Sequence, residues 1–136
     1  MTRRKKKKDL YLVLNTIKDS FQKISLSLKK NNIKSFDDYL NEWESRGAMI
    51  LELLVIGENI KYIPDEVQEK FNHMAWGELR EMRHEVAHDY PGIDFKATWK
   101  LVVQSDEFIE KIGEVAKHMN ITLEPRIGTS PGRFDL

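Results

Sequence analysis

Apolar residues recur every three or four positions along most of the chain, the spacing that places side chains on one face of an α-helix. The pattern predicts a first helix from Asp9 to Lys30, which Asn31 and Asn32 would end because asparagine tolerates the left-handed backbone conformation. No segment alternates apolar and polar residues as a half-buried strand does, so we expect helices alone. The buried stripe of the first helix would consist of Leu10, Leu14, Ile17, Phe21, Ile24 and Leu28.

A second long helix is predicted from residue 36 to residue 57, where the same spacing continues. Two of its stripe positions are Gly47 and Gly57. Because glycine costs a helix about 1 kcal/mol relative to alanine, we expect both glycines to serve the close approach of another helix. A short helix should then begin at Pro64 and end near Phe71.

The second half of the chain predicts two more long helices, separated by a proline and a glycine. The first covers residues 76–90 and is ended by Pro91 and Gly92, since the residue before a proline disfavours helical geometry. The last covers residues 95–119, and Asp94 stands where its side chain can cap the first turn.

Together these patterns predict an all-α fold, an up-and-down bundle of four long helices and one short one that spans residues 9–119. Residues 1–8 would form a basic N-terminal arm, and residues 120–136 an extended C-terminal tail. Stripes this regular and aromatic often cover more surface than one small bundle can bury, so a homodimer is also expected. We expect the three tryptophans to anchor the core or an interface rather than to stack on a ligand: Trp43, Trp76 and Trp99.

Composition narrows the classes of protein. A chain of 136 residues suits one domain with one core, and the lack of cysteine excludes disulfides and thiolate metal sites. The 22 basic and 22 acidic residues balance, but six basic ones lie in Arg3–Lys8, which leaves 16 against 22 elsewhere. This acidic body argues against a surface that binds nucleic acid everywhere. The arm is either a solvated terminus or a segment that contacts RNA phosphates or an acidic partner.

The chain shows neither a signal-peptide core nor an apolar run of the roughly 20 residues that cross a membrane. We therefore expect a cytoplasmic protein without a membrane partner.

Residues 80–94 hold more arginine, histidine, tyrosine and acidic side chains suited to catalysis than any other part of the chain. They carry two overlapping motifs. One is the run from His84 through Glu85 to His88, which matches the sequence motif of zinc-protease helices. In that motif two histidines four residues apart bind the metal, and the glutamate between them is the general base. Acidic residues between positions 106 and 110 could supply a third ligand. Such proteases usually bind peptide along a sheet edge, which this chain lacks, and His88 lies in the last turn before Pro91. Zinc hydrolysis is therefore disfavoured, and we expect neither a metal nor a cofactor.

The second motif pairs Arg83 with His88. Metal-free RNA cleavage needs a base for the 2′-hydroxyl proton, an acid for the leaving oxygen and a cation for the charge on phosphorus. Five helical residues place the two side chains about 140° apart, so they converge only if the helix end unwinds or if a second copy faces the first. The alternative is that neither residue is catalytic. Arg83 would then pair with Glu85 or Asp89 on the surface, and His88 would be favoured there by the helix dipole.

The segment from Arg46 to about Ile112 resembles the HepT-like branch of the HEPN domains. The resemblance rests on two signatures in the order and at the distance typical of that family: Ile-Gly-Glu, which ends at Glu58, and Arg-x4-His-x-Tyr, which runs from Arg83 to Tyr90. Further matching positions are Ile63, Pro64, Trp76, Leu79, Met82, Gly92, Asp94 and Trp99.

The resemblance implies a HEPN-type bundle that forms a homodimer and cleaves RNA as a metal-independent endoribonuclease. It implies the toxin of a type VII toxin–antitoxin pair, with Arg83 and His88 as catalytic residues at the dimer interface. The antitoxin of such a pair is a minimal nucleotidyltransferase that transfers AMP from ATP to the motif tyrosine, here Tyr90. The family usually has asparagine after the arginine, whereas this chain has His84, which is either an additional acid or base or a disturbance of the site.

Two alternatives stay open at this point. Glu58 either lines the same interface as the catalytic residues or forms an ion pair on the helix surface. The rival to the toxin is a non-catalytic HEPN module that docks on a nucleotidyltransferase or presents substrate to it. That class typically lacks the Arg-x4-His pair, so the intact pair favours the ribonuclease.

Overall fold

The computed structural model describes residues 9–125, and every regular element in that range is helical, which confirms the predicted all-α class there. The arm of residues 1–8 and the end of the tail, residues 126–136, lie outside the described part. The elements are α1 (Leu10–Lys30), α2 (Phe36–Asn41), α3 (Trp43–Ile60), α4 (Asp65–Lys70), α5 (Trp76–His88), the 3-10 turn η1 (Tyr90–Gly92), α6 (Phe95–Val102) and α7 (Ser105–His118).

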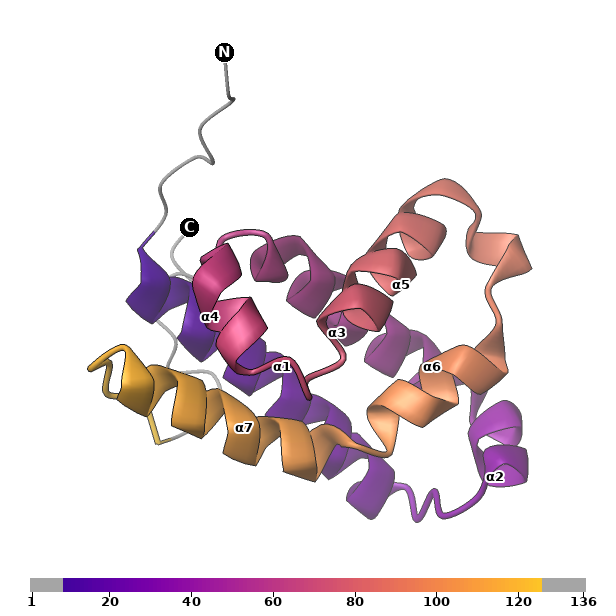
Figure 1. The fold of residues 1–136 in the computed structure, drawn as a ribbon. Coiled ribbons are helices and arrows are strands. Elements are labelled where there is room, and N and C mark those ends of the chain that lie inside the picture. The colour runs from indigo at the N-terminus through magenta and orange to yellow at the C-terminus, as the bar shows by residue number, and fades with distance from the viewer. Residues whose placement is uncertain (1–8, 126–136) are drawn as a thin grey trace, which may run out of the picture.

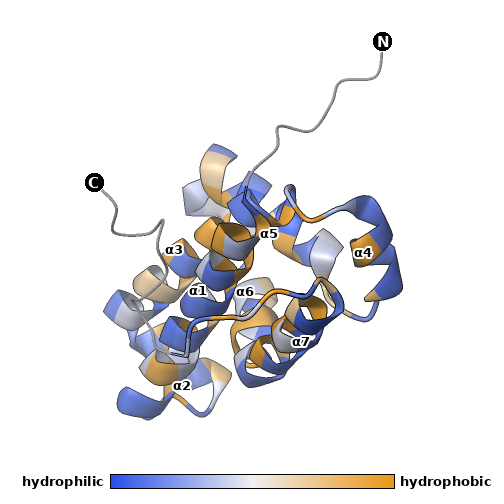
Figure 2. Cartoon of the chain, turned by 90° about the vertical axis from the view of Figure 1, so that its left-hand side faces the viewer, coloured by the Kyte–Doolittle hydropathy of each residue, from blue (hydrophilic) through white to orange (hydrophobic). Residues whose placement is uncertain are grey.

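The first helix is the one on which the bundle is assembled. α3 and α7 both pack along α1, and α5 packs on the other side of α3 (Figure 1). The predicted α1 stripe is buried in its middle, at Leu14, Ile17, Phe21 and Ile24, while its two ends are half-buried. The outer helices turn their polar sides outward, as the orange inner and blue outer sides of α4 illustrate in Figure 2.

The predicted second helix is divided in two at Glu42, which corrects the continuous helix expected for residues 36–57. Glu42 leaves helical geometry with a φ of −90° and a ψ of 65°. The break frees the carbonyl groups of Tyr39 and Leu40, and the guanidinium of Arg46 donates hydrogen bonds to both. The same guanidinium lies 4.2 Å from the centre of the Phe95 ring, so a cation–π contact helps to hold the corner.

The predicted last helix is also divided, after Val102, into α6 and α7. The hydroxyl of Ser105 donates to the carbonyl oxygen of Val102 at 2.7 Å, which satisfies an acceptor that the break releases. The break changes which side of the following helix is buried. Phe108 is 1% exposed and Ile112 is fully buried, whereas Ile109, the expected stripe residue, is only half-buried.

The burial of the three tryptophans differs, and only one of the two predicted close approaches at glycine is confirmed. Trp76 is buried and Trp99 half-buried, but Trp43 is 66% exposed. A Cβ atom on Gly47 would meet nothing within 4 Å, so the expected close approach is wrong for Gly47 within one described chain. For Gly57 the expectation is confirmed, as described below.

The start of the C-terminal tail, residues 121–125, has no regular secondary structure and lies against α1. The carboxylate of Glu124 accepts a hydrogen bond from the Tyr11 hydroxyl, and the Lys18 ammonium donates to the backbone carbonyl of Glu124. The amide of Glu124 donates to the Asn15 side chain at 2.7 Å. The chain therefore returns to the N-terminal half of α1. In residues 9–125, no helix combines the length and the apolar character that crossing a membrane requires.

Candidate active site

α3 and α5 approach each other closely at Gly57. A Cβ atom at this position would lie 2.4 Å from Cβ of Arg83 and 2.8 Å from the carbonyl oxygen of Leu79. Both distances are far inside van der Waals contact, so only glycine allows α5 to cross α3 so closely. The glycine of the Ile-Gly-Glu signature thus places Arg83 directly over α3.

The next residue of that signature holds the arginine. The Nε atom of Arg83 lies 2.5 Å from Oε1 of Glu58, and the other carboxylate oxygen lies 3.7 Å from the Lys61 ammonium. The side chains of Arg83 and Glu58 are 38% and 39% exposed. Within residues 9–125, no hydrogen bond or ion pair engages the two terminal nitrogens of Arg83. Arg83 is thus held by its Nε side, and its outer fork is free to bind an anion.

This partner settles one question that the sequence left open. Arg83 pairs neither with Glu85 nor with Asp89, the two surface partners suggested by helix spacing, but with Glu58 on another helix. Of the two possibilities that the sequence left open for Glu58, the ion pair is therefore present in the structure.

His84 and His88 form a second cluster on α5. Their ring centres are 4.4 Å apart, and both side chains are exposed. The helix is intact through His88, where the amide of Asp89 still donates to the carbonyl of Glu85 at 2.7 Å. Arg83 and His88 therefore keep their separation of about 140° around the helix axis. One chain alone does not bring them together.

The helix predicted for residues 76–90 ends two residues earlier, at His88, and the Pro-Gly stop forms the turn η1, which begins at Tyr90. A Cβ atom on Gly92 would lie 2.1 Å from a carboxylate oxygen of Asp89, so a side chain there would displace Asp89. The amide of Gly92 donates to the carbonyl of Asp89 at 3.0 Å. Tyr90, the first residue of the turn, is 52% exposed. The Tyr90 phenol is thus accessible to solvent, two residues after His88 in the chain.

An apolar strip on α3 is a feature that sequence reasoning missed. Trp43 is 66% exposed and Leu51 is 57% exposed, and helix geometry places both within about 80° of Glu58 around the helix axis. Gly47 lies between them with open space above it. Exposed apolar residues grouped on one side of a helix mark an interaction surface more often than scattered ones do. A helical projection of the α3 sequence at 100° per residue also places Trp43, Gly47 and Leu51 on one side of the helix.

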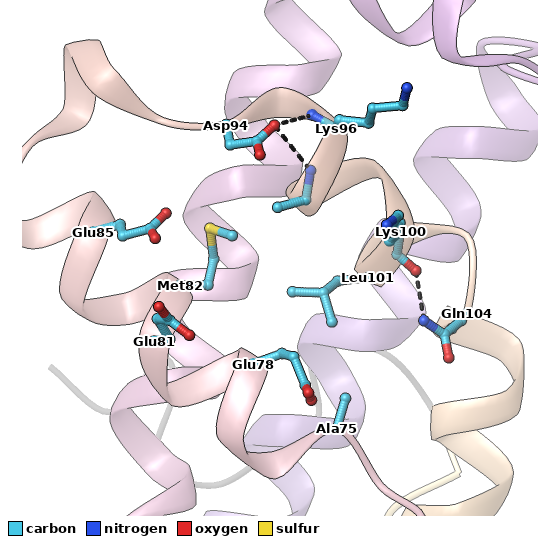
Figure 3. A pocket seen from close by; sticks show the side chains of 11 residues that line it. Ala75, Glu78, Glu81, Met82, Glu85, Asp94, Lys96, Lys100, Leu101 and Gln104 are labelled. Carbon is cyan, nitrogen blue, oxygen red and sulfur yellow. Dashed lines mark hydrogen bonds between the residues drawn. The ribbon is translucent and has the colours of Figure 1, made fainter.

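A groove of about 570 Å³ lies on another side of α5, between α5 and α6. Figure 3 shows Glu78, Glu81 and Glu85 along its α5 wall, with Lys96 and Lys100 rising from α6. None of these five side chains forms an ion pair with another residue in the part of the chain that the structure describes. Three carboxylates in a row repel phosphates, so this wall is a poor path for RNA.

Within residues 9–125, the structure brings no third metal ligand to His84 and His88 of the zinc-protease motif. Asp106 lies on α7, where the Ser25 hydroxyl donates to its carboxylate and holds the pKa of the Asp106 carboxyl below its usual range. Lys29 pairs with the other oxygen of Asp106 at 3.4 Å. Residues 9–125 contain no cluster of three or more histidine, aspartate or glutamate side chains arranged to hold a metal ion.

Comparison with known proteins adds to this geometry. Residues 13–119 match the family described as ribonuclease HepT-like. A Methanocaldococcus jannaschii protein named "Gamma-glutamylcyclotransferase and putative RNase" is 33% identical over 84% of this chain, and the match covers 52% of that relative. Another protein of that organism, named "Putative RNase", is 29% identical over 82% of this chain and 90% of its own length.

A further relative, "Probable ribonuclease HepT" of Thermococcus cleftensis, is 34% identical over 49% of this chain and 61% of its own length. This chain thus spans about half of the first of these three relatives and most of the second. No solved structure matches it.

Proposed function

Because this chain belongs to the ribonuclease HepT-like family, whose helical HEPN-type fold it shares, we propose that it is a metal-independent RNA endonuclease. In this proposal His88 is the general acid or base, and Arg83 binds the phosphate and stabilises the charge that develops on it.

The arrangement of Arg83 is the observation that carries the proposal. A carboxylate bound to the terminal fork of Arg83 would leave the arginine few donors for a phosphate. Here Oε1 of Glu58 lies 2.5 Å from Nε of Arg83, and Gly57 allows Arg83 to lie directly against α3. The outer fork, with its planar donors, is left for a phosphate, which it can bind bidentately.

His84 enters the proposal as an accessory group. Its ring stands 4.4 Å from that of His88, close enough to share a water molecule or to pass a proton through one. A second imidazole beside the first suits a reaction that needs both an acid and a base.

The proposed active form is a homodimer. Arg83 and His88 point to different sides of α5, so a second copy has to supply the missing group at each phosphate. The exposed strip of Trp43 and Leu51 lies on the side of α3 that carries Glu58, the partner of Arg83. Burial of this strip between two copies would bring the two arginines towards one shared groove.

We further propose that the protein is the toxin of a type VII toxin–antitoxin pair. Its antitoxin would be a minimal nucleotidyltransferase that transfers AMP to Tyr90. The exposure of Tyr90, 52%, leaves the phenol open to such an enzyme. An adenylyl group there would add a bulky anion two residues after His88 in the chain and repel RNA.

The first experiment measures cleavage of a labelled RNA by the wild type and by His88→Ala, with and without EDTA. We expect wild-type cleavage to persist in EDTA and to fall by about 100-fold or more in His88→Ala, the usual contribution of a general acid or base. The variant should keep its fold, because His88 is exposed in the single chain.

The other outcomes point elsewhere. Loss of cleavage in EDTA would indicate a metal site. Cleavage and growth inhibition retained in His88→Ala would remove His88 from the mechanism. No cleavage by the wild type under either condition would favour the non-catalytic docking module.

The second experiment tests neutralisation by AMP transfer. Incubation with ATP and a minimal nucleotidyltransferase, to be sought among the products of neighbouring genes, should add AMP to the wild type and abolish RNA cleavage. Tyr90→Phe should remain unmodified and active, since only the phenol oxygen is lost. Mass spectrometry identifies the acceptor, and modification of Tyr90→Phe to the wild-type extent would show that another residue accepts AMP.

A further inference from the structure

The two histidines of α5 have the geometry of a metal chelate. They lie four residues apart on an intact helix, so both rings project from nearly the same side. Both side chains are exposed, and their ring centres are 4.4 Å apart. Histidine at this spacing is a recurrent pair of ligands for first-row transition metals.

The observed ring separation is close to what a shared ion requires. Zinc–nitrogen bonds of about 2.0–2.1 Å at a tetrahedral angle place the two nitrogens about 3.3 Å apart and the ring centres about 5 Å apart. The change from 4.4 Å is below about 1 Å. Rotation of two exposed side chains within their rotamer wells covers that distance.

We propose that His84 and His88 chelate a divalent transition-metal ion of the zinc, nickel or copper class, and that the bound ion inhibits the protein. Since residues 9–125 offer no third histidine, aspartate or glutamate to the pair, water completes the coordination sphere. The result is a two-ligand, reversible site. The ion occupies the lone pair of the His88 imidazole, which then can neither accept nor deliver a proton.

The surroundings suit a cation. Glu81 and Glu85 lie within one turn of the pair, and neither forms an ion pair within the described part of the chain. Their carboxylates contribute negative potential, which opposes the positive charge of Arg80 one turn before His84. The charge of the neighbouring Arg83 is offset by Glu58. Imidazole ligands favour zinc, nickel and copper over magnesium, which prefers oxygen. Magnesium should therefore leave the pair unoccupied.

Only the inhibitory half of this inference rests on the proposed ribonuclease function, so metal binding is tested first and without an activity assay. Protein without a histidine tag is titrated with Zn²⁺ in a calorimeter. We expect one ion per chain for the wild type and at least about tenfold weaker binding for His84→Asn, since one of two ligands is lost.

His118→Asn is the matched control. It removes another exposed histidine from a helix, one whose ring contacts Phe71 at 5.7 Å and which lies on α7 rather than α5. It should bind Zn²⁺ as the wild type does. Absence of binding in the wild type, equal binding in His84→Asn, or loss of binding in His118→Asn would each overturn the site.

The activity arm then separates the two proposals. RNA cleavage is measured with Zn²⁺, with Mg²⁺ and after addition of EDTA, and each variant is compared with its own metal-free rate. We expect Zn²⁺ to inhibit the wild type, EDTA to restore cleavage and Mg²⁺ to have no such effect. His84→Asn should require at least about tenfold more Zn²⁺ for the same inhibition.

Each remaining outcome has one meaning. Equal inhibition of the wild type and His84→Asn would show that Zn²⁺ acts elsewhere and would overturn the inhibitory role. A wild type that never cleaves RNA defeats the ribonuclease proposal, whereas the calorimetric result still decides whether the metal site exists.

Discussion

At the scale of single residues, the ion pair between Glu58 and Arg83 gives the site its most specific geometry. An exposed pair of this kind contributes about 0–1 kcal/mol to stability, which is too little to explain it as a structural device. Its effect is to fix the direction of the guanidinium, and misplacement of a catalytic group by about 1 Å can cost about 100-fold in rate.

Glu58→Gln should therefore act on turnover rather than on folding. We expect kcat for RNA cleavage to fall about ten- to hundredfold, because a neutral amide holds the guanidinium less firmly. The KM for RNA should not rise, since a negative charge near the phosphate is removed. Steady-state kinetics on a short labelled RNA measure both quantities.

Lys61→Gln is the control for Glu58→Gln, because Lys61 contacts the other carboxylate oxygen at 3.7 Å and leaves the Arg83 contact in place. It should cleave RNA at close to the wild-type rate. An unchanged kcat in Glu58→Gln would mean that Glu58 does not position Arg83.

The sequence predicted these residues better than it predicted their partners. Spacing and the family resemblance point to Arg83, His88 and Tyr90, whose roles stay predictions. Their helix and turn are where the pattern placed them. The pairing of Arg83 with Glu58 joins two helices across 25 positions, and spacing within one helix carries no information on it.

At the scale of helices, the crossing of α3 over α5 depends on the absence of one side chain. Gly57→Ala should destabilise the fold, because the new methyl group meets Arg83 Cβ at 2.4 Å. Overpacking costs about 1–3 kcal/mol and outweighs the gain of up to about 1 kcal/mol in helix propensity. Cleavage should fall as well, since α5 and its arginine must move away.

Thermal unfolding followed by circular dichroism checks this prediction, and Gly113→Ala is the matched control. Gly113 also lies inside a helix, α7, but a Cβ atom there would meet nothing within 4 Å. The control should unfold at a temperature equal to or above that of the wild type. A Gly57→Ala protein as stable and active as the wild type would contradict the close crossing.

Helix type was readable from the sequence, but helix continuity was not. The apolar period predicted every helical stretch, yet it ran unbroken through Glu42 and Val103, where two of the expected helices are divided. No proline or glycine marks either break. Side-chain hydrogen bonds to freed carbonyl groups stabilise both breaks. The Arg46 guanidinium donates at the first break, and the Ser105 hydroxyl donates at the second.

At the scale of the whole molecule, the exposed strip on α3 is the surface on which a dimer would form. Leu51→Glu places a charge on a side chain that is 57% exposed in one chain, so the monomer should fold normally. In the proposed dimer this charge would be buried without a partner. We expect Leu51→Glu to be monomeric by light scattering and to lose RNA cleavage.

Leu26→Glu is the control for surface charge. Leu26 is 54% exposed on α1, outside the strip, and its replacement should leave both the oligomeric state and the cleavage rate unchanged. Wild-type dimers that persist in Leu51→Glu would place the interface on another surface.

The return of Glu124 to α1 has a consequence for how such a domain can be joined to others. The two ends of the described chain, Asp9 and Pro125, leave from the side of the bundle where α1 begins, whereas the last turn of α5 points to the opposite side (Figure 1). Asp9 and Pro125, the two ends of the described chain, therefore lie away from the last turn of α5, which carries His88. A domain fused to this bundle would be attached on that side, and not beside the histidine pair.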